Sequence, residues 1–235
     1  MSGKPDDRLE ALKATRRSTL EMAEALRDIG TAFSTAELGA EDLAAALELT
    51  RRLRGHLDGP RRPRWYEPGI DASAGGPEAQ HDYLDRSPVR GVLNPIAPPL
   101  DLKSETRDDG SRVIVGRARL GIAYEGPPHG VHGGWIAALF DEVLGAAQGL
   151  DGSVSVTAIL TVKYREITPI DEELRFTAWV ARKRAGRRVV KATCHARNRL
   201  TADAEGIFIA VDLDDVRQRM APDQGGTTNG ARDLR

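Results

Sequence analysis

The chain has 235 residues, 40% of them hydrophobic and 29% charged, and its formal net charge at pH 7 is −1. This size and apolar content suit one domain with an appendage, and the near-zero charge gives no general attraction to nucleic acid or to an anionic membrane. No apolar stretch is long enough to span a bilayer and the polar opening MSGKPDDRLE has no apolar signal core, so we expect a soluble, cytoplasmic protein.

Residues 1–60 predict an N-terminal helical arm. Apolar residues recur at helical spacings in two successive segments, and Gly59-Pro60 ends the second. Basic and acidic residues nearly balance in this arm, which argues against DNA as its partner. Six arginines lie between Arg51 and Arg64, so a phosphate-binding role stays open beside that of a solvated helix end. The arm presents an apolar stripe that needs a partner surface.

Residues 61–91 are rich in Pro, Gly and Asp and predict a connector. Its expected anchors are aromatic and apolar: Trp65, Tyr66, Tyr83 and Leu84. At the other end of the chain, residues 217–235 are polar and Gly-rich, which predicts a disordered tail.

Residues 92–216 predict strand, strand, helix and then four strands. RDDG at residues 107–110 and Ala185-Gly186 are typical of hairpin turns, and LTAD at residues 200–203 is taken as the last turn. Cys194, the single cysteine, lies in the alternating run VVKATCHAR, which favours a packed strand thiol and fits a reducing compartment.

The helical segment WIAALFDEVLGAA is apolar over well over half of its circumference. A helix of this kind must be covered nearly all round. We expect the sheet to cover one side and a second copy of the chain to cover another.

The stretch GPPHGVHGG leads directly into this helix. Gly133 and Gly134 fall at the helix start, where backbone N–H groups have no intrahelical acceptor, so a ligand oxygen can approach them as in an oxyanion hole. Asp141 on the same helix then suits a general base or a nucleophile. The alternative is a glycine pair that only permits a tight chain entry, with Asp141 and Glu142 solvated.

HGGWIAALFDEVLG resembles the signature of PaaI-like acyl-CoA thioesterases of the hotdog-fold superfamily: His-Gly-Gly, then Asp nine positions after the His. The likeness covers about residues 92–214. It implies an α+β hotdog fold, in which an antiparallel six-stranded sheet wraps around one long central helix, here with an N-terminal helical extension. It also implies thioester hydrolysis without a metal or an organic cofactor.

The same resemblance assigns roles to five residues. Gly133 would polarise the thioester carbonyl through its amide, with Gly134 close by, and His132 would brace the loop or contact the substrate. Asp141 would act on a thioester bound mainly against the other subunit's helix start, as nucleophile or as base for water. Thr157 occupies the place of a residue that orients water, although an ordinary strand residue is equally compatible.

One departure from the family concerns an Asn that some relatives carry shortly before the His. This chain has Gly126, Pro127 and Pro128 there, and the nearest polar candidate is Glu125. The water-positioning part of the mechanism therefore lacks its usual residue.

An acyl-CoA also needs cations for its phosphates. The hairpin ARKRAGRRVVK offers four cations, Lys183, Arg184, Arg187 and Arg188. Arg187 and Arg188 are the candidates for binding phosphate. The alternative is a charged turn that only keeps the edge of the sheet soluble, which has the same sequence pattern. Trp135 is expected in the acyl pocket wall or in the core.

The predicted function is acyl-CoA thioester hydrolysis by a homodimer at minimum, with a tetramer or hexamer open. Two rivals remain: a non-catalytic acyl-CoA-binding or regulatory hotdog protein, and a hotdog lyase, which would need a His soon after Asp141 that the chain lacks before His195. Acyl carrier protein remains open as the carrier. The five histidines show no metal-ligand spacing, so no metal is expected.

Overall fold

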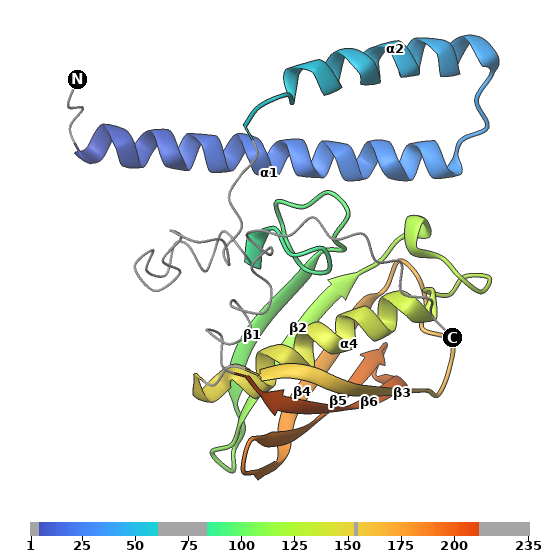
Figure 1. The fold of residues 1–235 in the computed structure, drawn as a ribbon. Coiled ribbons are helices and arrows are strands. Elements are labelled where there is room, and N and C mark those ends of the chain that lie inside the picture. Colours follow the sequence, from blue (N-terminus) through green and yellow to red (C-terminus); the bar gives the residue numbers. More distant parts are fainter. Residues whose placement is uncertain (1–4, 61–83, 153–154, 212–235) are drawn as a thin grey trace, which may run out of the picture.

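The computed structural model describes residues 5–60, 84–152 and 155–211, and shows two long helices followed by a sheet that curves around a third (Figure 1). The predicted connector anchors Trp65, Tyr66 and Tyr83 and the predicted tail lie outside the described residues. The helices are α1 (Pro5–Thr35), α2 (Ala40–His56) and α4 (Gly133–Gln148), with short 3-10 turns η1 (Ile122–Tyr124) and η2 (Gly149–Asp151). The strands are β1 (Leu100–Thr106), β2 (Arg112–Arg119), β3 (Ser155–Tyr164), β4 (Glu173–Arg184), β5 (Arg187–Ala196) and β6 (Arg199–Ala210).

The six strands form one antiparallel sheet in the order β1-β2-β4-β5-β6-β3. The last three strands in the chain are the predicted meander, and β3 closes the far edge by pairing with β6. α4 runs across one face of this sheet, as Figure 1 shows. The predicted hotdog fold with a helical extension is therefore confirmed.

The core lies between α4 and the sheet because both elements are apolar on the facing side. Along β4, Leu174, Phe176 and Ala178 are fully buried while the intervening residues are not, as strand alternation requires. Phe140 of α4 meets Phe176 edge to face, with ring centroids 5.2 Å apart. Each such buried side chain stabilises the fold by roughly 1.5–3 kcal/mol, so this seam fixes the helix on the sheet.

The hairpin turns agree with the sequence at two places and differ at a third. Gly110 and Gly186 both adopt positive φ, as the predicted turns require. The last turn is wrong in the prediction: residues 200–203 belong to β6, and Arg197 and Asn198 make a two-residue turn with φ of 49° and 63°. Asn198 favours a turn, but Arg197 at a left-handed position gives no turn signal in the sequence, whereas LTAD contains an Asp.

The arm forms the two predicted helices, which differ in how they pack. In α1, Ala23 is buried, and this helix contacts η1 of the hotdog domain. No described residue of α2 is buried, and Leu47 and Leu49 are about half exposed. The apolar stripe of α2 is therefore still without the partner surface that the sequence calls for, within the described residues.

The structure also bears on the search for a membrane-spanning helix and on the environment of Cys194. Among the described residues, no helix combines the length and the apolar character that a membrane crossing requires. Cys194 is buried, as predicted, and burial raises the pKa of its thiol to about 12. This side chain is therefore a packing residue and not a nucleophile.

Candidate active site

The start of α4 brings His132, Gly133 and Gly134 together as predicted, but one of the two amides is occupied. His132 is the N-cap residue, and its Nδ1 accepts a hydrogen bond of 3.0 Å from the amide of Gly134. The expectation of two free amides is therefore wrong for Gly134. The reason is helix capping: a side-chain acceptor at the N-cap satisfies the second amide of the helix. The imidazole performs this role with Nδ1 unprotonated.

Gly133 keeps the amide that the prediction requires. Within the described part of the chain, no group accepts a hydrogen bond from this N–H, and the residue lines a cavity. The helix dipole adds positive potential at the same point. One backbone donor at a helix N-terminus is thus available to an oxygen atom of a ligand.

Tyr164, at the end of β3, was not singled out from the sequence, yet it lies directly against this glycine. Its hydroxyl donates a hydrogen bond of 2.8 Å to the carbonyl oxygen of Gly133. A Cβ at position 133 would lie 3.2 Å from the tyrosine ring, so glycine fits here with least strain. No sequence motif marks Tyr164, since its role depends on β3 running beside α4.

A cavity of about 340 Å³ opens next to the amide of Gly133. Its apolar wall includes Val131 and Ile136, the second of which is on the first turn of α4. The other residues around it are Pro127, Tyr164, Arg165, Glu166, Ile167 and Thr168. The volume lies at the small end of the range for ligand sites.

Asp141 and Thr157 form a second cluster, farther along the helix. The Thr157 hydroxyl donates a hydrogen bond of 2.8 Å to Oδ1 of the Asp141 carboxylate. Asp141 is half-buried and Thr157 is exposed on the edge strand β3. The two predicted residues therefore meet, and the contact fixes the orientation of the carboxylate.

The two clusters are separated along α4. Asp141 follows Gly133 by eight residues, which at 1.5 Å per residue is about 12 Å along the axis. One carboxylate at that distance cannot reach a carbonyl group that is bound to the Gly133 amide of the same chain. Within one copy, the amide of Gly133 and the carboxylate of Asp141 therefore lie at separate places along the helix.

Glu142, to which the sequence gave no role, is held by two side chains from the segment that precedes β1. Its carboxylate lies 3.2 Å from Nε of Arg90 and accepts a hydrogen bond of 3.1 Å from the hydroxyl of Ser87. Burial raises the pKa of Glu142, and the charge of Arg90 and the hydrogen bond from Ser87 oppose this rise. The partners are about fifty residues away in the chain, so no local pattern could have revealed them.

Two of the predicted substrate-binding residues are already engaged. Arg188 donates a hydrogen bond of 2.7 Å to Ser155, lies 3.7 Å from the Asp151 carboxylate and has a side chain that is only 13% exposed. Trp135 packs edge to face on Tyr124, with centroids 5.2 Å apart, and does not line the cavity. Arg188 is therefore engaged by polar groups of its own chain, and Trp135 packs against Tyr124, next to the core, which is one of the two places that the sequence left open for it. Arg187 is exposed and remains a predicted phosphate ligand.

Glu125, the nearest polar candidate before the His-Gly-Gly triplet, is used by its own loop. Its carboxylate accepts a hydrogen bond of 2.7 Å from the amide of His129. That contact stabilises the positive φ of His129, so the carboxylate of Glu125 is engaged within the loop. Among the described residues, no group of three or more His, Cys, Asp or Glu side chains is arranged to hold a metal ion.

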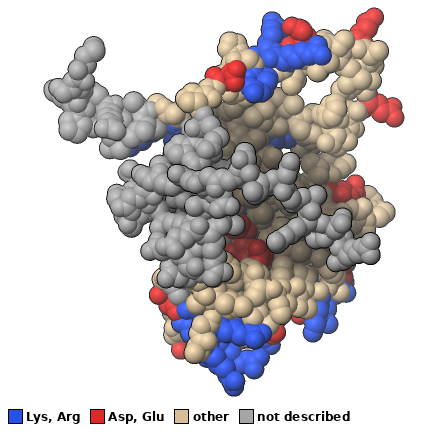
Figure 2. Space-filling view, in the orientation of Figure 1, with Lys and Arg blue, Asp and Glu red and all other residues tan. Residues whose placement is uncertain are grey.

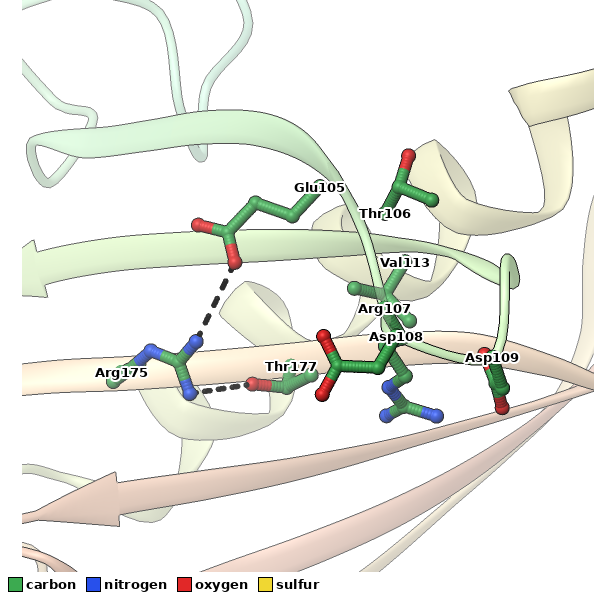
Figure 3. A pocket seen from close by; sticks show the side chains of 8 residues that line it. All are labelled: Glu105, Thr106, Arg107, Asp108, Asp109, Val113, Arg175 and Thr177. Atoms are coloured by element: carbon green, nitrogen blue, oxygen red, sulfur yellow. Dashed lines mark hydrogen bonds and ion pairs between the residues drawn. The ribbon is translucent and has the colours of Figure 1, made fainter.

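A second cavity, of about 530 Å³, lies away from all of these residues (Figure 3). It is on the face of the sheet opposite α4, because Arg175 and Thr177 alternate with the buried residues of β4. Arg175 reaches across it to Glu105, at 3.7 Å, and also donates a hydrogen bond to Thr177. Its lining carries three acidic and two basic side chains, and it is not part of the site at α4.

Comparison with known proteins shows which families this chain resembles. Residues 129–202, which include both clusters, match the family model of the thioesterase superfamily. The human acyl-coenzyme A thioesterase THEM5 (Homo sapiens) is 26% identical over 97 residues. That match spans 40% of this chain and 39% of THEM5, so the chain covers about two fifths of the length of this curated relative.

Solved structures extend the comparison. The crystal structure of protein RHA08564, a thioesterase superfamily protein, is 28% identical, with a TM-score of 0.66 over 81% of this chain and 90% of that chain. The PaaI protein of E. coli is 17% identical over 48% of this chain and 80% of that chain, with a TM-score of 0.44. The predicted resemblance to the hotdog-fold thioesterases is confirmed. Of these two structures, only that of RHA08564 is similar enough to support the fold assignment.

Proposed function

We propose that this hotdog-fold relative of the thioesterase superfamily hydrolyses the thioester bond of acyl-CoA in a site shared between two copies of the chain. The observation that carries the proposal is the amide of Gly133, which has no acceptor among the described residues and lies at a cavity beside the start of α4. The similarity to THEM5, an acyl-CoA thioesterase, supports the substrate class.

The Gly133 amide would bind the carbonyl oxygen of the thioester. Negative charge develops on that oxygen when the carbonyl carbon is attacked, and a fixed N–H at a helix N-terminus stabilises it. One such donor contributes about 3 kcal/mol to the transition state. The His132 cap holds the first turn of α4 in place, so the donor is already oriented.

The second copy would attach along β3. This strand is an edge of the sheet, and apolar side chains are exposed along it and just beyond its end. A long edge with exposed apolar residues is a liability unless it is paired. Antiparallel pairing of β3 with β3 of a second copy covers these side chains and continues the sheet; the exposed residues are Val156, Ile159, Tyr164 and Ile167.

The two clusters of the site select a register for this pairing. Thr157 marks the position of Asp141 along β3, and Tyr164 marks that of Gly133. Because Ala158 is bulged out of the pairing with β6, Thr157 and Tyr164 lie on the same face of the strand. Pairing Thr157 with Tyr164 of the second copy puts Thr161 opposite itself on the two-fold axis. Asp141 of one copy then lies beside Gly133 of the other.

In this site, Asp141 acts either as the base that takes a proton from water or as the nucleophile. With water as the attacking group, its oxygen bonds to the carbonyl carbon, the C–S bond breaks, and the thiolate of CoA takes a proton. The products are a carboxylic acid and free CoA. Thr157 holds one oxygen of the carboxylate, which leaves Oδ2 for the reaction.

The phosphates of CoA would meet cations at the β4–β5 hairpin. Lys and Arg side chains gather at the lower end of the molecule in Figure 2, where Figure 1 has the β1–β2 and β4–β5 hairpins. In the proposed dimer this end of one copy approaches the helix start of the other. Arg187, which is exposed, is the residue that we assign to a phosphate group.

The buried free thiol of Cys194 suits a reducing compartment, and we place the reaction in the cytoplasm. The alternative function is acyl-CoA binding without hydrolysis, in a regulatory protein. The exposed apolar stripe of α2 favours it, because a regulator needs a surface for a partner.

A panel of short, long and aryl acyl-CoA thioesters, assayed by release of free thiol, separates the two functions. We expect turnover by the native protein and its loss in Asp141→Asn, which keeps the affinity for a non-hydrolysable thioether analogue. Binding of the analogue without hydrolysis of any thioester would favour the regulatory function. If the protein neither bound the analogue nor hydrolysed any thioester, both functions would be contradicted.

A further inference from the structure

The carboxylate of Glu142 is largely buried, and its partners come from the segment that precedes the first strand of the sheet. It lies 3.2 Å from Nε of Arg90, and the two side chains are only 24% and 17% exposed. The hydroxyl of Ser87 donates a second contact, at 3.1 Å. Removal of either charged partner would leave the other charge half-buried and without its counter-charge, so this contact ties α4 to the segment that precedes β1.

Arg90 and Ser87 belong to a loop, residues 84–94, that is closed on itself by backbone hydrogen bonds. Its backbone is closed by hydrogen bonds from the amide of Gly91 to Ser87, at 3.0 Å, and from the amide of Leu93 to Asp85, at 2.8 Å. A Cβ at Gly91 would lie about 2.5 Å from backbone atoms of the same loop. The loop therefore presents Arg90 and Ser87 to Glu142 in a fixed geometry.

The N-terminal arm holds the same loop. Arg27 of α1 donates a hydrogen bond of 3.0 Å to the carbonyl oxygen of Asn94, and Arg16 forms an ion pair with Asp85. These arginines are eleven residues apart, three turns of helix, so they point from one face of α1. Figure 1 shows α1 lying over this loop. The arm is thus connected through side chains to Glu142.

Glu142 is the neighbour of Asp141 on α4. Adjacent residues on a helix point about 100° apart, so one faces the 84–94 loop while the other faces Thr157 on β3. Any rotation of α4 about its axis moves both carboxylates together. A contact that fixes Glu142 also fixes the direction of Asp141.

We infer that Arg90 and Glu142 are positioning residues for Asp141, and that the N-terminal arm sets their geometry through the 84–94 loop. This inference rests on the proposed hydrolysis of acyl-CoA. It assigns the arm a function within its own chain: docking of α1 keeps the carboxylate of Asp141 aimed at the shared cleft.

Turnover of the full chain tests the pair directly. We expect Arg90→Met and Glu142→Gln each to lower kcat about tenfold with KM changed less than twofold, because neither residue touches the substrate. The double variant should be no slower than the slower single variant, since both changes break one contact. Arg90→Lys, which keeps the charge, should recover kcat to within about threefold of the native value. Additive losses, or full kcat in both single variants, would overturn the inference.

A variant of the arm tests the longer connection. Arg27→Met removes the contact with Asn94 and should lower kcat about threefold to tenfold, although α1 lies outside the site. Arg17, an exposed arginine on the same helix, provides the matched control, and Arg17→Met should leave kcat unchanged. Equal kcat in Arg27→Met and Arg17→Met would contradict a role for the arm.

Hydrogen exchange separates a failure of this inference from a failure of the proposed function. We expect the amides of residues 84–94 to exchange faster in Glu142→Gln than in the native protein, and those around Glu142 in α4 to exchange faster in Arg27→Met. If the native protein hydrolyses no thioester, the proposed function fails, and hydrogen exchange alone tests whether the arm and the 84–94 loop are coupled to Glu142. Unchanged exchange in both segments would then overturn this coupling.

Discussion

The hydroxyl of Thr157 donates a hydrogen bond of 2.8 Å to Oδ1 of Asp141 and so joins the edge strand β3 to the middle of α4. The sequence left Thr157 open between an ordinary strand residue and a residue of the site. Its contact with the carboxylate favours a residue of the site. Because of this contact, the orientation of the Asp141 carboxylate depends on β3 as well as on α4.

Thr157→Val keeps the shape of the side chain and removes the hydroxyl. We expect kcat to fall roughly tenfold to a hundredfold, because a hydrogen bond to a charged group contributes about 1.5–3 kcal/mol. Thr157→Ser keeps the donor and should stay within about threefold of the native kcat. The measurement is thiol release at saturating acyl-CoA, and native turnover in the valine variant would contradict the role of Thr157.

Gly133→Pro removes the proposed oxyanion donor without breaking the helix. Proline is well tolerated at the first position of a helix, and His132, with φ −59° and ψ 130°, has the extended backbone that a residue before proline prefers. We expect kcat to fall about 100-fold to 1,000-fold, the usual loss on removal of one such donor.

The control for this variant is Gly133→Ala, which introduces a Cβ 3.2 Å from the ring of Tyr164 but keeps the N–H. We expect it to lose less than tenfold in kcat. Similar losses in the alanine and proline variants would mean that crowding against Tyr164, and not the amide, accounts for the effect.

The proposed register of the dimer puts Thr161 opposite itself. Directly opposed residues of antiparallel strands have Cα atoms about 4.5–5.5 Å apart, within the range that a disulfide requires. We therefore expect Thr161→Cys to form a covalent dimer on mild oxidation, seen as a doubled mass without reductant. Cys194 is buried and, with a pKa of about 12, does not compete.

Lys163→Cys serves as the control for the register. Its two copies would be offset by four residues, about 13 Å, which is too far for a disulfide. Cross-linking of Lys163→Cys but not of Thr161→Cys would contradict the register, and a monomer in sedimentation would contradict the β3 interface.

The raised pKa of Glu142 predicts a pH dependence of stability. Burial is the main cause of the rise above the usual 4.5. A carboxyl that binds its proton more tightly in the folded chain contributes stability that is fully present below about pH 4.5 and is lost as pH rises through the raised pKa. Glu142→Gln cannot titrate, so the free energy of unfolding of the native protein minus that of the variant should fall over this interval. Urea unfolding in steps from pH 4 to pH 7, at one protein concentration, measures it; a constant or rising difference would contradict the assignment.

Much of the fold could be predicted from the sequence because it depends on local pattern. Alternation in ELRFTAWVARKR matches β4, Glu173–Arg184, and the apolar helix begins at the glycine pair, as expected. The turn at Arg197 and Asn198 was missed because its left-handed backbone is imposed by the pairing of β5 with β6, and not by glycine.

The candidate site was predictable only where its chemistry is contiguous in sequence. The triplet at residues 132–134 and Asp141 follow from one motif, but the cap on Gly134 depends on the rotamer of His132. Tyr164 and Arg90 come from other elements, and only the folded chain brings them to Gly133 and Glu142. Contacts between different helices and strands leave no fixed residue spacing in the sequence, so they cannot be predicted from it.

The central claim is that Gly133 of one copy and Asp141 of another form one site, and mixing two inactive variants tests it most directly. Gly133→Pro and Asp141→Asn, unfolded together and refolded as a mixture, give heterodimers with one site that has both native residues. Half of the dimers are then heterodimers with one of two sites intact, so we predict recovery of about a quarter of the native turnover. Turnover that stays at the level of the separate variants, in a mixture shown by mass to contain heterodimers, would contradict a shared site.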